Sequence, residues 1–194
     1  MTSIHTETIL LADDDRLILH TMARGLRGAG YTVIEADSGQ SSIELCQEVL
    51  PDLAILDMRM KDLSGLDVAK WLNANMPTSF IFLSAYDDHE TVQAATSLGA
   101  LGYLVKPVSV QQMLPSIRAA LARGEEIQQL KTTEQQLNHA INSSRDLSVA
   151  IGMLMERLDI GQQEAFEKIR QNAREQRCKT LQIAADIIRG KIIA

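Results

Sequence analysis

The chain has 194 residues, a net charge of −6 and 45% hydrophobic residues, an ordinary composition for a protein with a globular core. No apolar run of about 18 residues occurs, and the first residues lack the basic and apolar regions of a signal peptide, so neither a membrane protein nor a secreted one is expected. The two cysteines, Cys46 and Cys178, show no metal-binding spacing and no disulfide framework, which favours a reducing cytoplasm.

The charge is distributed unevenly along the chain. Residues 1–124 carry 9 basic and 15 acidic residues, which gives −6, whereas residues 150–194 carry 8 basic and 6 acidic residues, which gives +2. The acidic composition argues against a protein that binds nucleic acid over its whole surface, although it is compatible with a local basic face. We therefore expect two modules with different partners.

Strand and helix patterns alternate over residues 1–122, the predicted first domain. The predicted strands are 8–12, 31–36, 53–57, 79–84 and 102–105. The amphipathic helices between them are predicted at about 17–27, 39–48, 65–74 and 88–98. This alternation indicates an α/β fold with a doubly wound, five-stranded parallel sheet.

From Val110 onward the pattern is helical throughout. Residues 123–145 are predicted to form a connecting helix with an imperfect coiled-coil seam, in which polar residues fill two positions. The apolar seam positions are Ile127, Leu130, Leu137 and Ile141. The seam is expected to pair with a second copy of the chain, and the alternative is a helix that packs back on its own chain. Residues 146–194 are predicted to form a small domain of three helices, at 146–157, 162–177 and 180–189.

Charged and polar side chains stand where the predicted strands end. They are Asp13, Asp14 and Asp15 after the first strand, Asp57 at the end of the third, Ser84 at the end of the fourth and Lys106 after the fifth. The carboxyl ends of parallel strands share one edge of a sheet, and ligands bind at that edge. Clustered carboxylates repel one another, and a hard cation such as Mg²⁺ relieves that repulsion. Asp15 is expected to cap the following helix instead.

Asp57 is the predicted nucleophile of this cluster. It follows four apolar residues of a buried strand, where a lone carboxylate would be costly. With its charge offset by Mg²⁺ and Lys106, a carboxylate can attack the phosphorus of a phosphodonor. The hydroxyl of Ser84 can then donate a hydrogen bond to the new phosphoryl group.

Residues 7–122 resemble the receiver domain of two-component response regulators. The motifs that carry the resemblance are Leu11–Asp15, Leu56–Met60 with Gly65, Leu83–Ala85 and Tyr103–Pro107. The resemblance implies a flavodoxin-like fold, and it implies that a sensor histidine kinase phosphorylates Asp57. It further implies that Lys106 contacts the phosphoryl group, and that the Lys106–Pro107 peptide bond is cis.

The same resemblance implies a metal site and a switch. Mg²⁺ would be bound directly by Asp14, Asp57 and the backbone carbonyl of Arg59, with Asp13 acting mainly through water. The switch positions are Ser84, which would be drawn toward the phosphoryl group, and Tyr103, which would then turn inward. On its own pattern Tyr103 is an ordinary half-buried strand residue. One departure from the family is Lys61, which stands where a proline is common.

The last 45 residues contain a one-sided basic stripe. Its members are Lys168, Arg170, Arg174, Arg177 and Lys179. Such a stripe taken alone is usually a solvated helix face. Because few aromatic residues are available for stacking on bases, recognition of RNA would depend on charge and shape.

Residues 140–190 resemble an ANTAR domain, the RNA-binding module of antitermination regulators. The motifs are Ala150–Arg157, Glu164–Arg170, Ala173–Arg174 and Leu181–Ala184. The resemblance implies that a dimer binds hairpins in leader RNA and prevents a terminator from forming. It adds Ala150, Gly152 and Arg157 to the predicted RNA contacts, with Gly152 also expected to allow close helix approach. Ile151 stands where the family often has a lysine.

These inferences predict a response regulator that prevents transcription termination when it is phosphorylated. The chain is not expected to be an enzyme, apart from its own Mg²⁺-dependent phosphorylation and slow dephosphorylation. A phosphatase for other substrates would need a general acid beside Asp57, and the motif around Asp57 supplies none. The alternatives are a receiver with a DNA-binding helical output and one whose output docks another protein.

Overall fold

The computed structural model describes residues 6–85 and 89–191. The first residues of the chain and Asp88, the predicted start of the fourth helix, lie outside the described residues. Within the described ranges, no helix is both long enough and apolar enough to span a membrane. The elements are β1 (Thr8–Ala12), α1 (Arg16–Gly28), β2 (Thr32–Ala36), α2 (Gly39–Val49), β3 (Leu53–Asp57), α3 (Gly65–Asn75), β4 (Ser79–Ser84), α4 (His89–Ser97), β5 (Tyr103–Val105), α5 (Val110–Leu158), α6 (Gln162–Glu175) and α7 (Thr180–Ile188).

The strands form one parallel sheet with the order β2-β1-β3-β4-β5. This confirms the predicted doubly wound, flavodoxin-like α/β fold. Strands β2 and β5 each begin one residue later than predicted. The order places β1 beside β3, so that the acidic ends of these two strands become neighbours.

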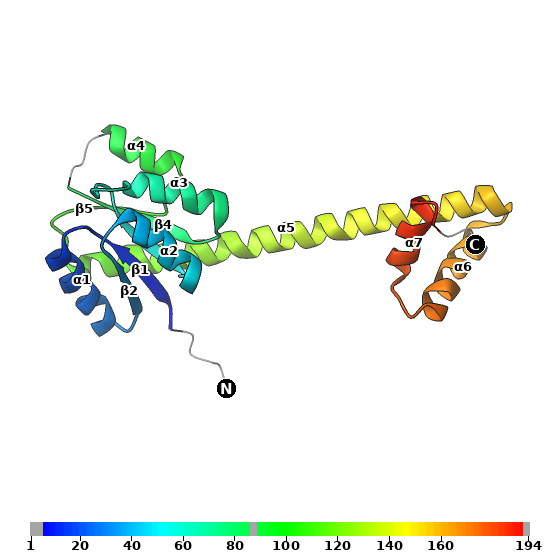
Figure 1. The fold of residues 1–194 in the computed structure, drawn as a ribbon, viewed down its shortest axis with the longest axis horizontal. Helices are drawn as coiled ribbons and strands as arrows, with labels where there is room; N and C mark the ends of the chain where they lie inside the picture. The colour runs from blue at the N-terminus through cyan, green and yellow to red at the C-terminus, as the bar shows by residue number, and fades with distance from the viewer. Residues whose placement is uncertain (1–5, 86–88, 192–194) are drawn as a thin grey trace. The chain divides into compact units, whose positions relative to one another are not determined.

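Helices flank the sheet on both faces (Figure 1). Strand β3 is buried along its whole length, and its side chains alternate between two cores. Leu53 and Ile55 pack with residues of α1 and α5. Ala54 and Leu56 pack with residues of α2, α3 and α4. A strand buried on both faces carries a continuous apolar run, which is the pattern that predicted it.

Side-chain caps fix the starts of the helices that follow the strands. Asp15 accepts hydrogen bonds from the amides of Leu17 and Ile18, so its predicted role as the cap of α1 is confirmed. Ser38 accepts a hydrogen bond from the Ser41 amide at the start of α2. These caps satisfy amides that have no partner within the helix.

Helix α5 is continuous from Val110 to Leu158, so the predicted helical stretch at 146–157 is the last part of α5. No glycine or proline lies between Gly124 and Gly152 to interrupt it. The apolar seam residues Leu130, Leu137 and Ile141 are 56–63% exposed. The expected alternative, in which this face packs back on its own chain, is therefore not observed at these three positions.

The chain divides into two compact units, Met1–Gln129 and Leu130–Ala194, and α5 contributes residues to both. The second unit has its own core. Ala150 and Leu154 at the end of α5 pack with residues of α6 and α7. The predicted three-helix domain thus exists, with the end of α5 as its first helix.

Candidate functional site

Three carboxylates meet at the carboxyl ends of β1 and β3. An oxygen from each of Asp13, Asp14 and Asp57 lies within 4.8 Å of the others. Asp13 and Asp57 are buried, and Asp14 is partly exposed. The pairing of β1 with β3 brings them together, because Ala12 lies beside Leu56 and each strand continues directly into its aspartates.

Lys106 pairs with two of these carboxylates. Its ammonium lies 2.6 Å from an oxygen of Asp13 and 2.9 Å from an oxygen of Asp57. Its backbone amide donates a hydrogen bond to the Ser84 carbonyl at 2.7 Å, which holds it against the end of β4. The following Lys106–Pro107 peptide bond is cis, as the resemblance implied. The predicted lysine is therefore positioned to offset charge at Asp57.

The ionisation of this cluster is shifted by burial and by its own charges. Burial raises the pKa of Asp57, the negative charges of Asp13 and Asp14 raise it further, and Lys106 partly opposes this. Burial disfavours the Lys106 ammonium, but its hydrogen bonds to Asp13 and Asp57 prevail and raise its pKa. Lys106 is therefore a permanent cation beside a carboxylate that gains from any further positive charge.

The donor atoms of the cluster suit a hard divalent cation. Carboxylate oxygens close together, with room for water, are what Mg²⁺ prefers. Asp14 is partly exposed and also lines a pocket of about 290 Å³, so solvent reaches the cluster on the side of Asp14. The predicted ligands Asp14 and Asp57 are thus together, and Arg59, whose carbonyl is the third predicted ligand, follows two residues after Asp57.

The two predicted switch residues lie on neighbouring strands. Ser84 ends β4 and is 3% exposed. Tyr103 begins β5, lies opposite Phe82 in the sheet and is half-buried against the core on the α4 side. Ser84 therefore stands at the carboxyl end of the sheet, and Tyr103 packs toward the helices on one face of it. Their switching role stays a prediction.

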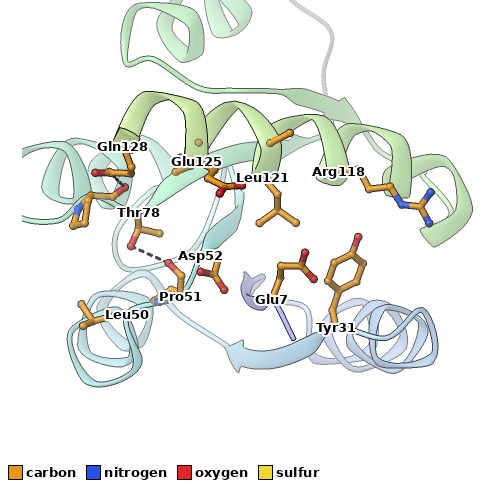
Figure 2. A pocket seen from close by; sticks show the side chains of 14 residues that line it. Glu7, Tyr31, Leu50, Pro51, Asp52, Thr78, Arg118, Leu121, Glu125 and Gln128 are labelled. Carbon is orange, nitrogen blue, oxygen red and sulfur yellow. Dashed lines mark hydrogen bonds between the residues drawn. The ribbon is translucent and has the colours of Figure 1, made fainter. Parts of the chain in front are cut away.

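A larger cavity lies at the opposite edge of the sheet. It measures about 760 Å³ and is lined by residues just before β1, β2 and β3, by residues before and at the start of β4, and by one face of α5. Figure 2 shows Leu121 of α5 pointing toward Glu7 and Tyr31 across this cavity. None of the predicted site residues lines it, so the size of a cavity does not identify the chemical site here.

The structure corrects the predicted RNA contact of Ala150 and the predicted packing role of Gly152, whose RNA contact stays a prediction. Ala150 is fully buried in the core of the second unit, so its side chain cannot contact RNA. Its small size is explained by helix packing. Gly152 is exposed, and a β-carbon built on it would meet nothing within 4 Å, so it does not serve a close helix approach within this chain.

The side chains of the remaining predicted RNA contacts differ in how far they are exposed to solvent. Arg157, Arg174, Arg177 and Lys179 are exposed, and Lys168 and Arg170 are half-buried. The Arg170 guanidinium lies 2.7 Å from a carboxylate oxygen of Glu167 and 5.8 Å from the centre of the Phe166 ring. Ala165, Ile169 and Ala173 occupy the buried face of α6. The basic residues of this helix, Lys168, Arg170 and Arg174, are partly or fully exposed to solvent.

Two family models match the chain. A response regulator receiver domain matches residues 9–118, and an ANTAR domain matches residues 135–188. The chain is a response regulator with a C-terminal ANTAR domain.

Relatives of this response regulator agree with that assignment. Over 181 residues it is 30% identical to the transcriptional regulatory protein PdtaR of Mycobacterium tuberculosis, which covers 93% of the chain and 88% of PdtaR. The transcriptional regulatory protein KdpE of the same organism is 35% identical over 115 residues, 59% of this chain and 51% of KdpE. The match to PdtaR therefore spans both units, whereas the match to KdpE covers 59% of this chain.

Solved receiver domains share the fold of the first unit. The signal receiver domain of a Luxo repressor protein from Vibrio parahaemolyticus superimposes with a TM-score of 0.60 at 25% identity, covering 64% of this chain and 97% of that one. The receiver domain of the response regulator NarL from Mycobacterium tuberculosis gives 0.56 at 30% identity, covering 60% and 97%.

Sequence reasoning missed two residues beside the regulator's acidic cluster. The ammonium of Lys61 lies 3.5 Å from an oxygen of Asp14. The carboxylate of Asp62 accepts hydrogen bonds from the amides of Gly39 and Gln40 at the start of α2. Lys61 was visible in the sequence only as a departure from the family, and nothing in the sequence indicated that Asp62 binds a helix 22 residues earlier.

Proposed function

We propose that a sensor histidine kinase phosphorylates this regulator on Asp57, and that phosphorylation promotes binding of leader-RNA hairpins by the C-terminal unit. RNA binding would prevent a terminator hairpin from forming. The observation that carries the proposal is the buried Asp57 carboxylate, 2.9 Å from Lys106 and clustered with Asp13 and Asp14, in one chain with an ANTAR module.

The proposed chemistry is a transfer of a phosphoryl group to a carboxylate. An oxygen of Asp57 attacks phosphorus while the bond to the donor's leaving group breaks, and the leaving group departs with the bonding electrons. Lys106 offsets the charge of the transferred group, and the Ser84 hydroxyl donates a hydrogen bond to it. Asp14, Asp57 and the Arg59 carbonyl would hold Mg²⁺, which supplies further charge neutralisation when it is bound. No reaction on another substrate is proposed.

The proposed signal leaves the site through β4 and β5. Phosphorylation adds about 1.5 to 2 negative charges at Asp57. Ser84 moves toward the phosphoryl group, and Tyr103 turns inward into the space that this movement opens. The surface formed by α4, β5 and the start of α5 changes as a result.

The proposed output is a dimer that binds two RNA hairpins. The exposed seam of Leu130, Leu137 and Ile141 supplies an apolar face for a second copy. Two linked modules raise the effective concentration of the second contact, so bivalent RNA is held more tightly than one hairpin. The exposed basic residues at the end of α6 and between α6 and α7, Arg174, Arg177 and Lys179, would contact the phosphates.

The test compares wild type with Asp57→Asn, each with and without a small-molecule phosphodonor and Mg²⁺, in binding to a paired-hairpin RNA. Wild type is expected to bind RNA more tightly after phosphorylation, and Asp57→Asn is expected not to respond. Glu48→Gln is the control. It removes an exposed carboxylate near the C-terminal end of α2, and this variant should respond like wild type. An equal response of Asp57→Asn and wild type would refute the mechanism.

The same assay separates the alternative outputs. Unlabelled duplex DNA should compete poorly with leader RNA. Stronger competition by DNA than by RNA would favour a DNA-binding output, and phosphorylation-dependent capture of a protein without any RNA binding would favour a docking output.

A further inference from the structure

The loop between β3 and α3 places a lysine beside the acidic cluster. The Lys61 ammonium lies 3.5 Å from a carboxylate oxygen of Asp14, and its side chain is 88% exposed. Both residues line the pocket of about 290 Å³ at this edge of the sheet. Lys61 therefore stands on the side of the cluster that is open to solvent.

The backbone on both sides of Lys61 is held in place. Met60 is buried and belongs to the core on the side of α2 and α3. Asp62 accepts hydrogen bonds from the amides of Gly39 and Gln40, at 2.9 Å and 2.8 Å. Because its neighbours are anchored, the backbone of Lys61 stays within reach of Asp14, and only its side chain is free to move.

The two lysines at the cluster have different partners. Lys106 is paired with Asp13 and Asp57, whereas Lys61 is paired with Asp14. Lys106 is largely buried and its contacts are short, so it is a fixed part of the site. Lys61 is exposed and its contact is long, so a stronger cation can displace it.

We propose that Lys61 competes with the divalent cation for Asp14 and thereby lowers the metal affinity of the phosphorylation site. The inference rests on the proposed function because it takes Asp14 and Asp57 as the metal ligands. A divalent cation must displace the ammonium from Asp14 and then lies near its positive charge. The metal concentration that supports phosphorylation is consequently higher than it would be without Lys61.

The experiment measures Mg²⁺ binding to the full chain by calorimetry, without phosphodonor or RNA. Lys61→Gln is expected to bind Mg²⁺ about two- to fivefold more tightly than wild type, the range for an exposed ion pair. Lys61→Arg keeps the cation and should stay near wild type. Lys70→Gln is the matched control, because Lys70 is also exposed and also paired with an aspartate, on α3. It removes the same charge without touching Asp14.

Salt provides a second readout. The Debye length falls from about 10 Å at 0.1 M salt to about 3 Å at 1 M, so added salt weakens the interaction between exposed charges. The ratio between the affinities of Lys61→Gln and wild type should therefore shrink as salt is added. A ratio that does not change with salt would argue against an electrostatic competition.

The other possible results of the calorimetry each support or overturn the proposed competition of Lys61 for Asp14. Equal affinities of Lys61→Gln and wild type would overturn the inference, and so would an equal gain in Lys70→Gln, which would assign the effect to net charge. If wild type binds Mg²⁺ and Lys61→Gln binds it more tightly, the inference stands even if phosphorylation fails to affect RNA binding. Failure of wild type to bind Mg²⁺, with Asp14→Asn no different, would overturn both the inference and the proposed metal site.

Discussion

The ammonium of Lys106 lies 2.9 Å from a carboxylate oxygen of Asp57, although β4 separates the two strands that lead to these residues. The same ammonium lies 2.6 Å from an oxygen of Asp13. One side chain thus connects the ends of β1, β3 and β5. Loss of the Lys106 side chain should therefore lower the stability of the fold and make the site more negative.

Lys106→Ala should destabilise the regulator in the absence of metal. Asp13 and Asp57 would be left buried without a cation, and the cost should be about 2–3 kcal/mol, below the full range for a buried pair because Lys106 is partly exposed. Added Mg²⁺ should restore part of this loss, because it supplies positive charge to the same carboxylates. Urea unfolding with a chelator and with Mg²⁺ measures both effects. Equal unfolding free energies for variant and wild type in the chelator would contradict the prediction.

Gly65→Ala should disturb the phosphorylation site, because a β-carbon on Gly65 would collide with the backbone carbonyl oxygen of Asp57. We expect a loss of about 1–3 kcal/mol, typical of overpacking, and slower phosphorylation of Asp57. Gly152→Ala is the matched control, since a β-carbon there meets open space inside helix α5. It should stabilise the chain by about 0.5–1 kcal/mol. Thermal unfolding of both variants checks this, and a stable Gly65→Ala would be inconsistent with the predicted collision.

Asp62→Ala should destabilise the chain in a pH-dependent way. The Gln40 amide lowers the pKa of Asp62 most strongly and desolvation opposes it, while the amides of Gly39, Leu63 and Asp62 itself lower it further, from its usual 3.8 to about 2. A carboxylate with a lowered folded-state pKa stabilises the fold above pH 3.8, and this contribution is lost as the pH falls toward 2. The variant should lose about 1 kcal/mol near neutral pH, as for a missing helix cap.

Denaturant unfolding at a series of pH values tests this dependence on Asp62. The difference in the free energy of unfolding between wild type and Asp62→Ala should be constant from neutral pH to about pH 4 and should become smaller below that. A difference that grows as the pH falls would mean that the sign of the pKa shift is wrong.

Arg174→Ala combined with Arg177→Ala should weaken RNA binding and its dependence on salt. Both side chains are exposed: Arg174 lies in the last turn of α6, and Arg177 follows two residues after the helix, which ends before the predicted residue 177. If each contacts a phosphate of a hairpin loop, the slope of log affinity against log salt should fall by about 0.7 per residue. Arg189→Ala, an exposed arginine after α7, is the control. An unchanged slope in the double variant would show that these arginines do not contact phosphates.

Much of the receiver unit is predictable from its sequence because its determinants are local. The apolar run of β3 and the alternation of strands with helices define a parallel sheet, and strand ends in such a sheet share one edge. Asp13, Asp57, Ser84 and Lys106 all stand at strand ends, so their gathering could be predicted without coordinates. The caps at Asp15 and Ser38 are equally local, because each acts on amides two or three residues away.

The second unit was less predictable because a helical pattern does not say which side chains a neighbouring helix will cover. Ala150 lies in a motif shared with RNA-binding modules, yet the packing of α6 and α7 buries it completely. The continuity of α5 likewise depends on the absence of a helix breaker, a weaker signal than the presence of one.

The sequence by itself determined the fold class, the family and the position of Asp57 at the end of a buried strand. These follow from patterns over a few neighbouring residues. Only the tertiary structure decided that Lys106 serves both Asp13 and Asp57, that Lys61 is paired with Asp14, and that Asp62 holds the start of α2. Those pairings depend on distances between segments far apart in the chain, and such distances are set by packing rather than by any local pattern.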